Sequence, residues 1–138
     1  MAKVLVDANV LLDILTADST WEPWSAAAMA RAAESSLLAI NPIVFAEVSI
    51  GFTSIEDLDA VLPAELQREA LPWDAAFLAG KAFLAYRRRG GPRSTPLPDF
   101  YIGAHAAVRG YALLTRDARR YRTYFPDLEL IAPPDGAS

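Results

Sequence analysis

The stretch Lys3-Val4-Leu5-Val6-Asp7-Ala8-Asn9 decides the fold of this chain. Its short apolar run, ended by the acid Asp7, is typical of a strand buried on both faces. The run Leu37-Leu38-Ala39-Ile40 repeats the pattern after an alanine-rich stretch, Trp21 to Ser36, that reads as a helix. Two buried strands joined by a helix predict a parallel sheet, because parallel strands need a crossover connection.

The alternation of strands and helices continues to the end of the chain. Further helices are expected at Pro42–Ile50, from Ser54 with Asp57 in its first turn, at Asp74–Arg89, from Pro98 and from Asp117, and further strands at Leu71–Trp73, Tyr111–Thr115 and Leu128–Ile131. The predicted class is α/β, a single domain with a central parallel sheet of four to five strands flanked by helices on both faces. We expect the domain to span residues 1–132, with residues 133–138 as a flexible tail.

Composition narrows the classes of function. The chain has 138 residues, 53% of them hydrophobic, which suits one domain with a substantial core. The absence of cysteine excludes disulfides, thiolate zinc sites and a cysteine nucleophile, so any metal must be held by oxygen atoms or by the single His105. No apolar run approaches the roughly 20 residues of a membrane span. We therefore expect a cytoplasmic protein with no membrane partner.

Charge is divided unevenly along the chain. Residues 1–80 contain three basic and twelve acidic side chains, whereas residues 81–138 contain ten basic and five acidic ones. A basic surface of this kind can hold a polyanion, and the residues predicted to bind RNA are Arg87, Arg88, Arg89, Arg93, Arg119 and Arg120. For the first three, a solvated helix end is an equally good interpretation, because cations favour the negative end of the helix dipole.

Four acids lie where a fold would rarely place them by chance: Asp7, Glu47, Asp99 and Asp117. Each follows a strand-like run or occupies the apolar face of a helix-like one. Three of them have a simpler interpretation as helix caps or first-turn acids. Glu47 does not, because its helical neighbours on the same face would be Ile43, Val44, Ile50 and Gly51.

One shared explanation covers all four acids. Clustered buried carboxylates are costly unless a cation pairs with them, and carboxylate oxygens suit Mg²⁺ or Mn²⁺. Such a site can activate water and neutralise a phosphate, so phosphodiester hydrolysis fits both the acids and the arginines. His105 is expected to be structural, since it lies six residues after Asp99 and off its helical face. No glycine-rich phosphate or dinucleotide motif is present.

The same residues resemble the PIN-domain ribonucleases of the VapC toxin type over nearly the whole chain. The resemblance is carried in order by Val4-Leu5-Val6-Asp7-Ala8-Asn9-Val10-Leu11-Leu12-Asp13, Asn41-Pro42-Ile43-Val44-Phe45-Ala46-Glu47-Val48, Asp99-Phe100-Tyr101-Ile102-Gly103-Ala104-His105-Ala106 and Leu113-Leu114-Thr115-Arg116-Asp117. It implies that the four acids bind Mg²⁺ or Mn²⁺ and position the attacking water, with Asn9, Thr115 and Arg116 as supporting groups.

The resemblance also implies a biological setting. Members of this family are typically cytoplasmic endoribonucleases that cut structured RNA such as transfer or ribosomal RNA, form homodimers, and are inhibited by a VapB-like antitoxin whose peptide reaches the acidic groove.

Three other functions are compatible with these residues. The chain could be a non-cleaving PIN-like module that binds RNA or a protein partner. It could be a metal-dependent phosphatase that uses Asp7 as a covalent nucleophile, as the Asp7-x-Asn9 spacing after a strand allows. A flap-type DNA nuclease would use the same site chemistry, and discrimination between RNA and DNA through the 2′-hydroxyl is not visible in the sequence.

Overall fold

Residues 2–92 and 97–134 are described by the computed structural model of the chain. Their strands form one sheet of five in the order β3-β2-β1-β4-β5, and every neighbouring pair is parallel. The strands are β1 (Ala2–Val6), β2 (Ser36–Ile40), β3 (Gln67–Arg68), β4 (Ala112–Leu114) and β5 (Leu130–Ile131). Arg93 and residues 135–138 of the expected tail lie outside the described residues.

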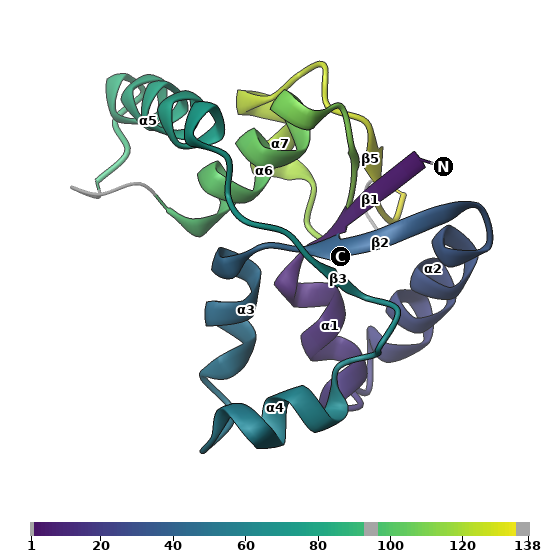
Figure 1. Cartoon of the computed structure of the whole chain (residues 1–138). Helices are drawn as coiled ribbons and strands as arrows, with labels where there is room; N and C mark the ends of the chain where they lie inside the picture. Colours follow the sequence, from purple (N-terminus) through teal and green to yellow (C-terminus); the bar gives the residue numbers. More distant parts are fainter. Residues whose placement is uncertain (1, 93–96, 135–138) are drawn as a thin grey trace.

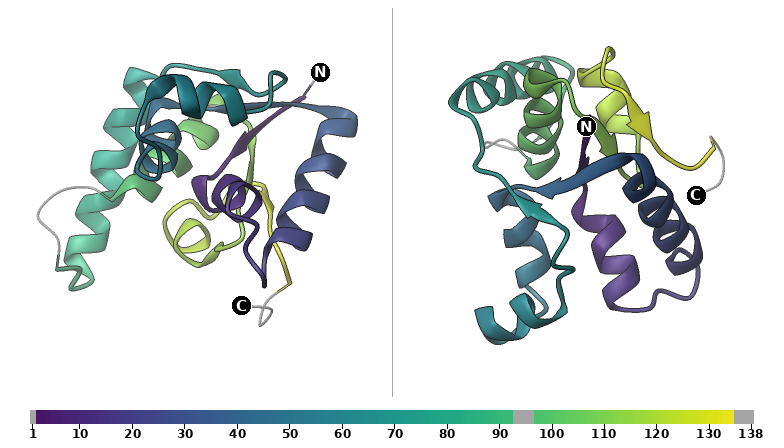
Figure 2. Two further views of the ribbon diagram at one scale, coloured as in Figure 1. Left: turned by 90° about the horizontal axis from the view of Figure 1, so that it is seen from below. Right: turned by 45° about the vertical axis from the view of Figure 1, so that its right-hand side comes forward.

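Helices cover both faces of this sheet. They are α1 (Ala8–Leu15), α2 (Glu22–Ser35), α3 (Pro42–Ser49), α4 (Ile55–Val61), α5 (Trp73–Arg88), α6 (Pro98–Arg109) and α7 (Arg119–Tyr124). Figure 1 shows α1 to α4 gathered on one side of the strands and α5 to α7 on the other, and the right-hand view of Figure 2 shows the same two groups. The predicted α/β fold, with its parallel sheet of four to five strands, is confirmed.

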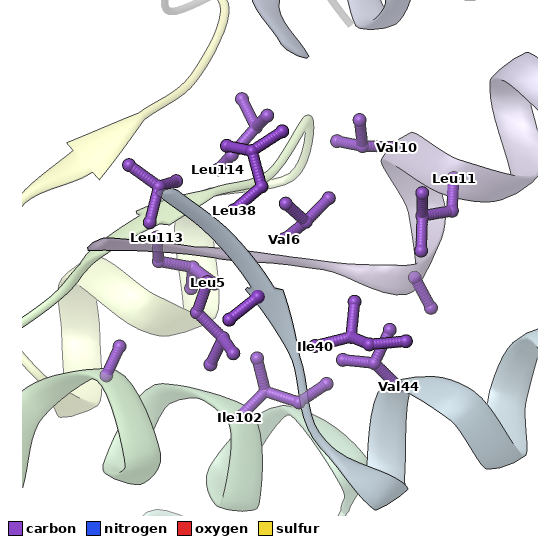
Figure 3. Packing of buried hydrophobic residues seen from close by; sticks show 14 of the residues in the cluster. Leu5, Val6, Val10, Leu11, Leu38, Ile40, Val44, Ile102, Leu113 and Leu114 are labelled. Carbon is purple, nitrogen blue, oxygen red and sulfur yellow. The ribbon is translucent and has the colours of Figure 1, made fainter. Parts of the chain in front are cut away.

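The strand β1 lies at the centre of the sheet because its apolar residues can be buried on both faces. Leu5 and Val6 are fully buried, and Val4 pairs with Leu38 on one side and Ala112 on the other. Figure 3 shows side chains from β1, β2 and β4 packing against Ile102 of α6 on one face and against α1 on the other. Burial of this kind contributes roughly 1.5–3 kcal/mol per large apolar side chain.

The expected third strand, Leu71–Trp73, is wrong. The third strand is β3, four residues earlier, and both of its side chains are exposed. Pro72 lacks a backbone N–H and caps the N-terminus of α5, while Trp73 is the first residue of that helix and is 92% exposed. The expected helix from Asp74 to Arg89 therefore exists, but begins and ends one residue earlier.

The carboxyl ends of β1 and β4 meet at one edge of the sheet. The backbone N–H of Asp7 donates to the carbonyl oxygen of Leu114 over 2.8 Å, so the residues that follow the two strands lie side by side. In parallel sheets, functional sites form at this edge. None of the helices in residues 2–92 and 97–134 is long and apolar enough to cross a membrane.

Candidate active site

Asp7 both caps a helix and belongs to the site. Its Oδ1 accepts a hydrogen bond from Ala8 N over 2.7 Å at the start of α1. Its Oδ2 accepts from Thr115 Oγ1 over 2.9 Å and from Tyr121 Oη over 2.8 Å. Burial, together with the charge of Asp99, raises the pKa of Asp7 to about 6 although these hydrogen bonds favour the ionised form.

Asp99 lies in the first turn of α6 and shares a hydroxyl with Asp7. Its Oδ1 is 3.4 Å from Tyr121 Oη, and its Oδ2 accepts from Arg120 Nη1 over 3.1 Å. Burial raises the pKa of Asp99, while the charge of Arg120 acts in the opposite direction. The Tyr121 hydroxyl has one proton and can donate a full hydrogen bond to only one of the two carboxylates at a time.

Glu47 approaches the same carboxylates from α3. Burial, followed by the charges of Asp7 and Asp99, raises its pKa to about 7. Its Oε1 is buried and has no hydrogen-bond partner among the described residues. The expected buried stripe around Glu47 is wrong in part: Val44 is buried, but Ile50 is 86% exposed and Gly51 is also exposed, because α3 ends at Ser49.

Asp117 lies at the rim of the site. Its side chain is 56% exposed and forms an ion pair with Arg119 at 3.5 Å, and its charge contributes to raising the pKa of Asp99. The helix expected to start at Asp117 is α7, which begins at Arg119 with Ala118 as its N-cap. Asp117 is therefore not a cap; its backbone N–H donates to Thr115 Oγ1 over 3.2 Å.

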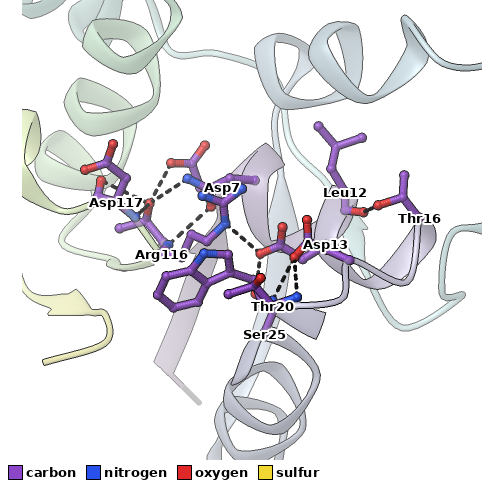
Figure 4. A network of polar contacts seen from close by, with 12 residues as sticks. Asp7, Leu12, Asp13, Thr16, Thr20, Ser25, Arg116 and Asp117 are labelled. Atoms are coloured by element: carbon purple, nitrogen blue, oxygen red, sulfur yellow. Dashed lines mark hydrogen bonds and ion pairs between the residues drawn. The ribbon is translucent and has the colours of Figure 1, made fainter. Parts of the chain in front are cut away.

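The three predicted supporting residues form the floor of the site. Thr115 is fully buried, donates to Asp7 and accepts from Asn9 Nδ2 over 3.2 Å. Asn9 Oδ1 accepts the backbone N–H of Arg116 over 3.2 Å. Figure 4 shows Asp7, Arg116 and Asp117, which this network joins, close together. Because Asn9 and Thr115 bond to each other and to both segments, they fix where the Asp7 carboxylate points.

Sequence reasoning missed Asp13 and Ser25. Asp13 is 2% exposed, and its Oδ2 accepts from Ser25 Oγ over 2.7 Å and from Arg116 Nε over 2.8 Å. The guanidinium of Arg116 lies 5.5 Å from the centre of the Trp21 ring. The available signal was an acid inside the apolar helix sequence Val10-Leu11-Leu12-Asp13-Ile14-Leu15. Tyr121 was missed too, because no local sequence pattern predicts its contact with Asp7.

His105 lies apart from the acids in a second polar network. It is fully buried, with Nδ1 3.1 Å from Asn41 Nδ2 and Nε2 2.8 Å from Glu69 Oε2. Glu69 Oε1 also accepts from Lys3 Nζ over 3.0 Å and from Tyr111 Oη over 2.9 Å. These contacts join β1, α6 and the segment after β3, which agrees with the expected structural role.

Some of the predicted arginines gather beside the acids. A hollow of about 360 Å³ is lined by Tyr86, Asp99, Asp117, Arg119, Arg120, Thr123 and Tyr124. Arg89 lies 5.7 Å from the centre of the Tyr124 ring but does not line this hollow, and Arg87 lies over Phe83. Arg88 is exposed at the end of α5. Arg93 is outside the described residues.

The residues present fit a hard divalent cation by their chemistry. Within residues 2–92 and 97–134, no group of three or more acidic or histidine side chains is drawn together closely enough to hold a metal as it stands. However, besides burial, the charge of Asp99 raises the pKa of Asp7, and the charges of Asp7 and Asp99 raise the pKa of Glu47. Glu47 Oε1 is a buried acceptor with no donor among the described residues. A set of oxygen ligands that lacks a compensating positive charge suits Mg²⁺ or Mn²⁺. In this structure Tyr121 donates to Asp7 and Asp99, and Arg120 donates to Asp99.

The family model of the PIN domain matches residues 4–126, so the chain belongs to the PIN domain family. The family predicted from the four motifs is therefore confirmed. No curated protein matches the chain significantly.

Several solved structures share the fold over almost the full length of both chains. VapBC2 from Rickettsia felis, bound to a DNA fragment from its promoter, has a TM-score of 0.73 at 20% identity and covers 96% of this chain and 99% of that chain. VapBC-1 from nontypeable Haemophilus influenzae has a TM-score of 0.71 at 16% identity, with 94% and 97% covered. DNA-bound VapBC from Salmonella typhimurium has a TM-score of 0.66 at 21% identity, with 96% and 98% covered.

Proposed function

We propose that this chain is a Mg²⁺- or Mn²⁺-dependent endoribonuclease and the toxin of a toxin–antitoxin pair. It hydrolyses phosphodiester bonds in structured RNA, with transfer or ribosomal RNA as the expected substrates, in the cytoplasm. One arrangement carries the proposal: Asp7 and Asp99 both contact the Tyr121 hydroxyl, and burial followed by the charges of these two acids raises the pKa of Glu47 to about 7. Glu47 Oε1 has no donor among the described residues. Groups with pKa values perturbed in this way concentrate at functional sites.

Each residue has a defined part in this proposal. Asp7 and Asp99 are the principal ligands, and Glu47 and Asp117 complete the site. When bound, the cation supplies positive charge at the phosphate and acidifies water. The pKa of Glu47 is about 7 without a cation, and a bound cation would favour its ionised form, in which it can hold the attacking water.

The remaining polar groups orient the acids and the substrate. Thr115 holds Asp7 Oδ2 through a bond of 2.9 Å, and Asn9 holds Thr115 in turn. Arg119 and Arg120 line the hollow beside Asp99 and Asp117, where they can hold the phosphate backbone.

A covalent mechanism through Asp7 is less well supported. Both carboxylate oxygens of Asp7 accept hydrogen bonds, one from Ala8 N and two from the hydroxyls of Thr115 and Tyr121. A nucleophilic oxygen must be able to reach a phosphorus atom, but Asp7 as a whole residue is only 4% exposed. This geometry favours a ligand over a nucleophile.

The partners we propose are a VapB-like antitoxin and a second copy of the chain. The fold matches chains from several VapBC structures over nearly their whole length. Large apolar side chains are exposed in two regions: Ile50 after α3 with Ile55 at the start of α4, and Trp73 with Phe77 on α5. Exposed apolar surface of this kind favours protein contacts.

The test is incubation of the purified protein with total cellular RNA, with and without Mg²⁺ or Mn²⁺, followed by mapping of fragment ends. The wild type should give discrete metal-dependent cuts that the Asp99→Ala variant lacks. Asp74→Asn, at an exposed acid of α5, is the matched control and should cut normally. RNA that is bound but never cut with either metal would favour the non-cleaving module. Cutting of single-stranded DNA but not RNA would favour the DNA nuclease.

A further inference from the structure

Arg116 has a more specific arrangement than a supporting role requires. It stands between Thr115 and Asp117, and its backbone N–H bonds to Asn9 at the floor of the site. Its side chain turns away from the acids towards α1 and α2, where its Nε donates to Asp13 Oδ2 over 2.8 Å. Figure 4 shows Arg116 leading from the acid site to Asp13.

The position of this guanidinium is fixed by buried groups. The Asp13 side chain is 3% exposed and the Ser25 residue is 0% exposed, and Ser25 Oγ donates to the same oxygen that Arg116 binds. Moving the Arg116 guanidinium away would leave the buried Asp13 carboxylate without its charge partner, which is strongly unfavourable. The Trp21 ring lies 5.5 Å from the guanidinium carbon and restricts it further. Displacement of the Arg116 side chain therefore has a high free-energy cost.

Only one edge of the guanidinium is used inside the protein. Within the described residues, the side-chain hydrogen bond of Arg116 is the one from Nε, although the charge of Asp18 is close enough to interact with it. The Arg116 side chain is 32% exposed. The Nη atoms carry four more N–H donors in a planar fork, a geometry that matches the oxygens of a phosphate.

We propose that Arg116 binds one phosphate of the RNA backbone on the α1–α2 side of the acid site, with Asp13, Ser25 and Trp21 as the residues that position it. This inference rests on the proposed function for its substrate class.

The opposite side of the acids has a comparable arrangement. Arg120 lies 5.7 Å from the Tyr86 ring centre and 5.9 Å from the Phe100 ring centre, on the α5–α6 side. The acids thus lie between two arginines, each placed over aromatic rings. A nucleic acid chain bound at both would pass across the carboxylates.

The experiment measures binding separately from cleavage. A short fluorescein-labelled single-stranded RNA is titrated with wild-type protein in EDTA, between about 50 mM and about 200 mM salt, and followed by anisotropy. Arg116→Gln should weaken binding roughly tenfold and reduce the slope of log affinity against log salt by about 0.7, as expected for one lost phosphate contact on a single strand. Arg109→Gln, the same charge change at the far end of α6, should leave both nearly unchanged.

Two further variants separate positioning from charge. Arg116→Lys keeps the charge but loses the planar fork, so it should lose most of the affinity that Arg116→Gln loses. Asp13→Asn makes the protein one unit more positive, so simple attraction predicts tighter RNA binding, whereas lost positioning of Arg116 predicts binding weaker by roughly threefold. If Asp13→Asn does not fold in a thermal melt, Ser25→Ala, which removes one hydrogen bond to Asp13, takes its place with the same expected direction.

Several outcomes would overturn the inference: equal losses in Arg116→Gln and Arg109→Gln, normal binding by Arg116→Lys, or tighter binding by Asp13→Asn. The inference would also be overturned if Arg116→Gln bound RNA normally but lost binding to an acidic partner peptide. Wild-type protein that binds RNA through Arg116 but never cuts it with Mn²⁺ would refute the proposed hydrolysis and leave this inference standing.

Discussion

Replacement of Glu47 by glutamine should stabilise the cation-free protein at alkaline pH. The pKa of Glu47 is raised from 4.5 to about 7, so the folded protein holds this proton more tightly than the unfolded chain does. Between these two pH values the folded state binds more protons, and stability falls as the pH rises. The penalty is complete above about pH 7 and absent below about pH 4.5.

The size of this effect follows from the pKa. A rise of this extent corresponds to about 3 kcal/mol for a fully buried group. Because Glu47 is only partly buried and solvent screens its charge, we reduce the expected penalty to about 1–2 kcal/mol. Glutamine cannot ionise, so Glu47→Gln should raise the free energy of unfolding by that amount at pH 8, equivalent to a rise of about 3–8 °C in Tm.

The assay is urea unfolding in EDTA at pH 5 and pH 8. The gain of Glu47→Gln over wild type should be present at pH 8 and nearly absent at pH 5. Glu65→Gln, at an exposed glutamate, is the control for loss of one negative charge. Added Mn²⁺ should stabilise the wild type more than Glu47→Gln, because the variant has lost a ligand. A variant equal to or less stable than wild type at pH 8 would refute this account of the site.

Three other substitutions probe the remaining contacts. Tyr121→Phe removes a donor to ionised Asp7 and should cost about 1.5–3 kcal/mol at pH 8 but less at pH 5, below the Asp7 pKa of about 6; a loss independent of pH in urea unfolding would contradict this. Arg120→Gln removes the cation beside Asp99 and should tighten Mn²⁺ binding roughly fivefold by calorimetry, and weaker binding would show that the arginine does not compete. His105→Ala leaves buried polar partners unpaired and should cost about 2–4 kcal/mol, whereas a loss under 1 kcal/mol would show the network to be unimportant.

The strands that form the core could be predicted because their physical signal is local. Residues 4–6 and 38–40 are apolar on both faces, and only a doubly covered parallel sheet buries such runs completely. The edge strand β3 gives no such signal. Gln67 and Arg68 are exposed and belong to the sheet only through backbone pairing with Ala39 and Ile40. The position of β3 at the sheet edge depends on where α4 ends in space, and no local sequence pattern predicts that position.

The site was predictable to the extent that its acids interrupt apolar sequence. Asp7 and Glu47 could be found in this way, because a carboxylate inside a buried run needs an explanation. Tyr121 could not, and although Arg116 was expected as a supporting residue beside Asp117, its contact with Asp13 was not. Both contacts are with residues more than one hundred positions away. An aromatic residue or an arginine in a short helix or turn is ordinary in sequence, and only the fold shows what each one faces.

A comparison of Asp13, which is buried, with Glu47, which is partly buried, shows how the structure distinguishes structural from functional carboxylates. Asp13 receives a guanidinium and a hydroxyl from the chain itself, so its charge is fully compensated without any ligand. Glu47 receives no donor among the described residues, and its pKa rises to about 7. A fold can compensate buried acids with its own arginines, as it does at Asp13, and additional compensation at Glu47 would increase stability. Glu47 has no such partner among the described residues, and the charges of Asp7 and Asp99 add to its raised pKa. A bound cation would supply the positive charge that these acids lack, so the acids that weaken the cation-free fold are those that we expect to bind metal.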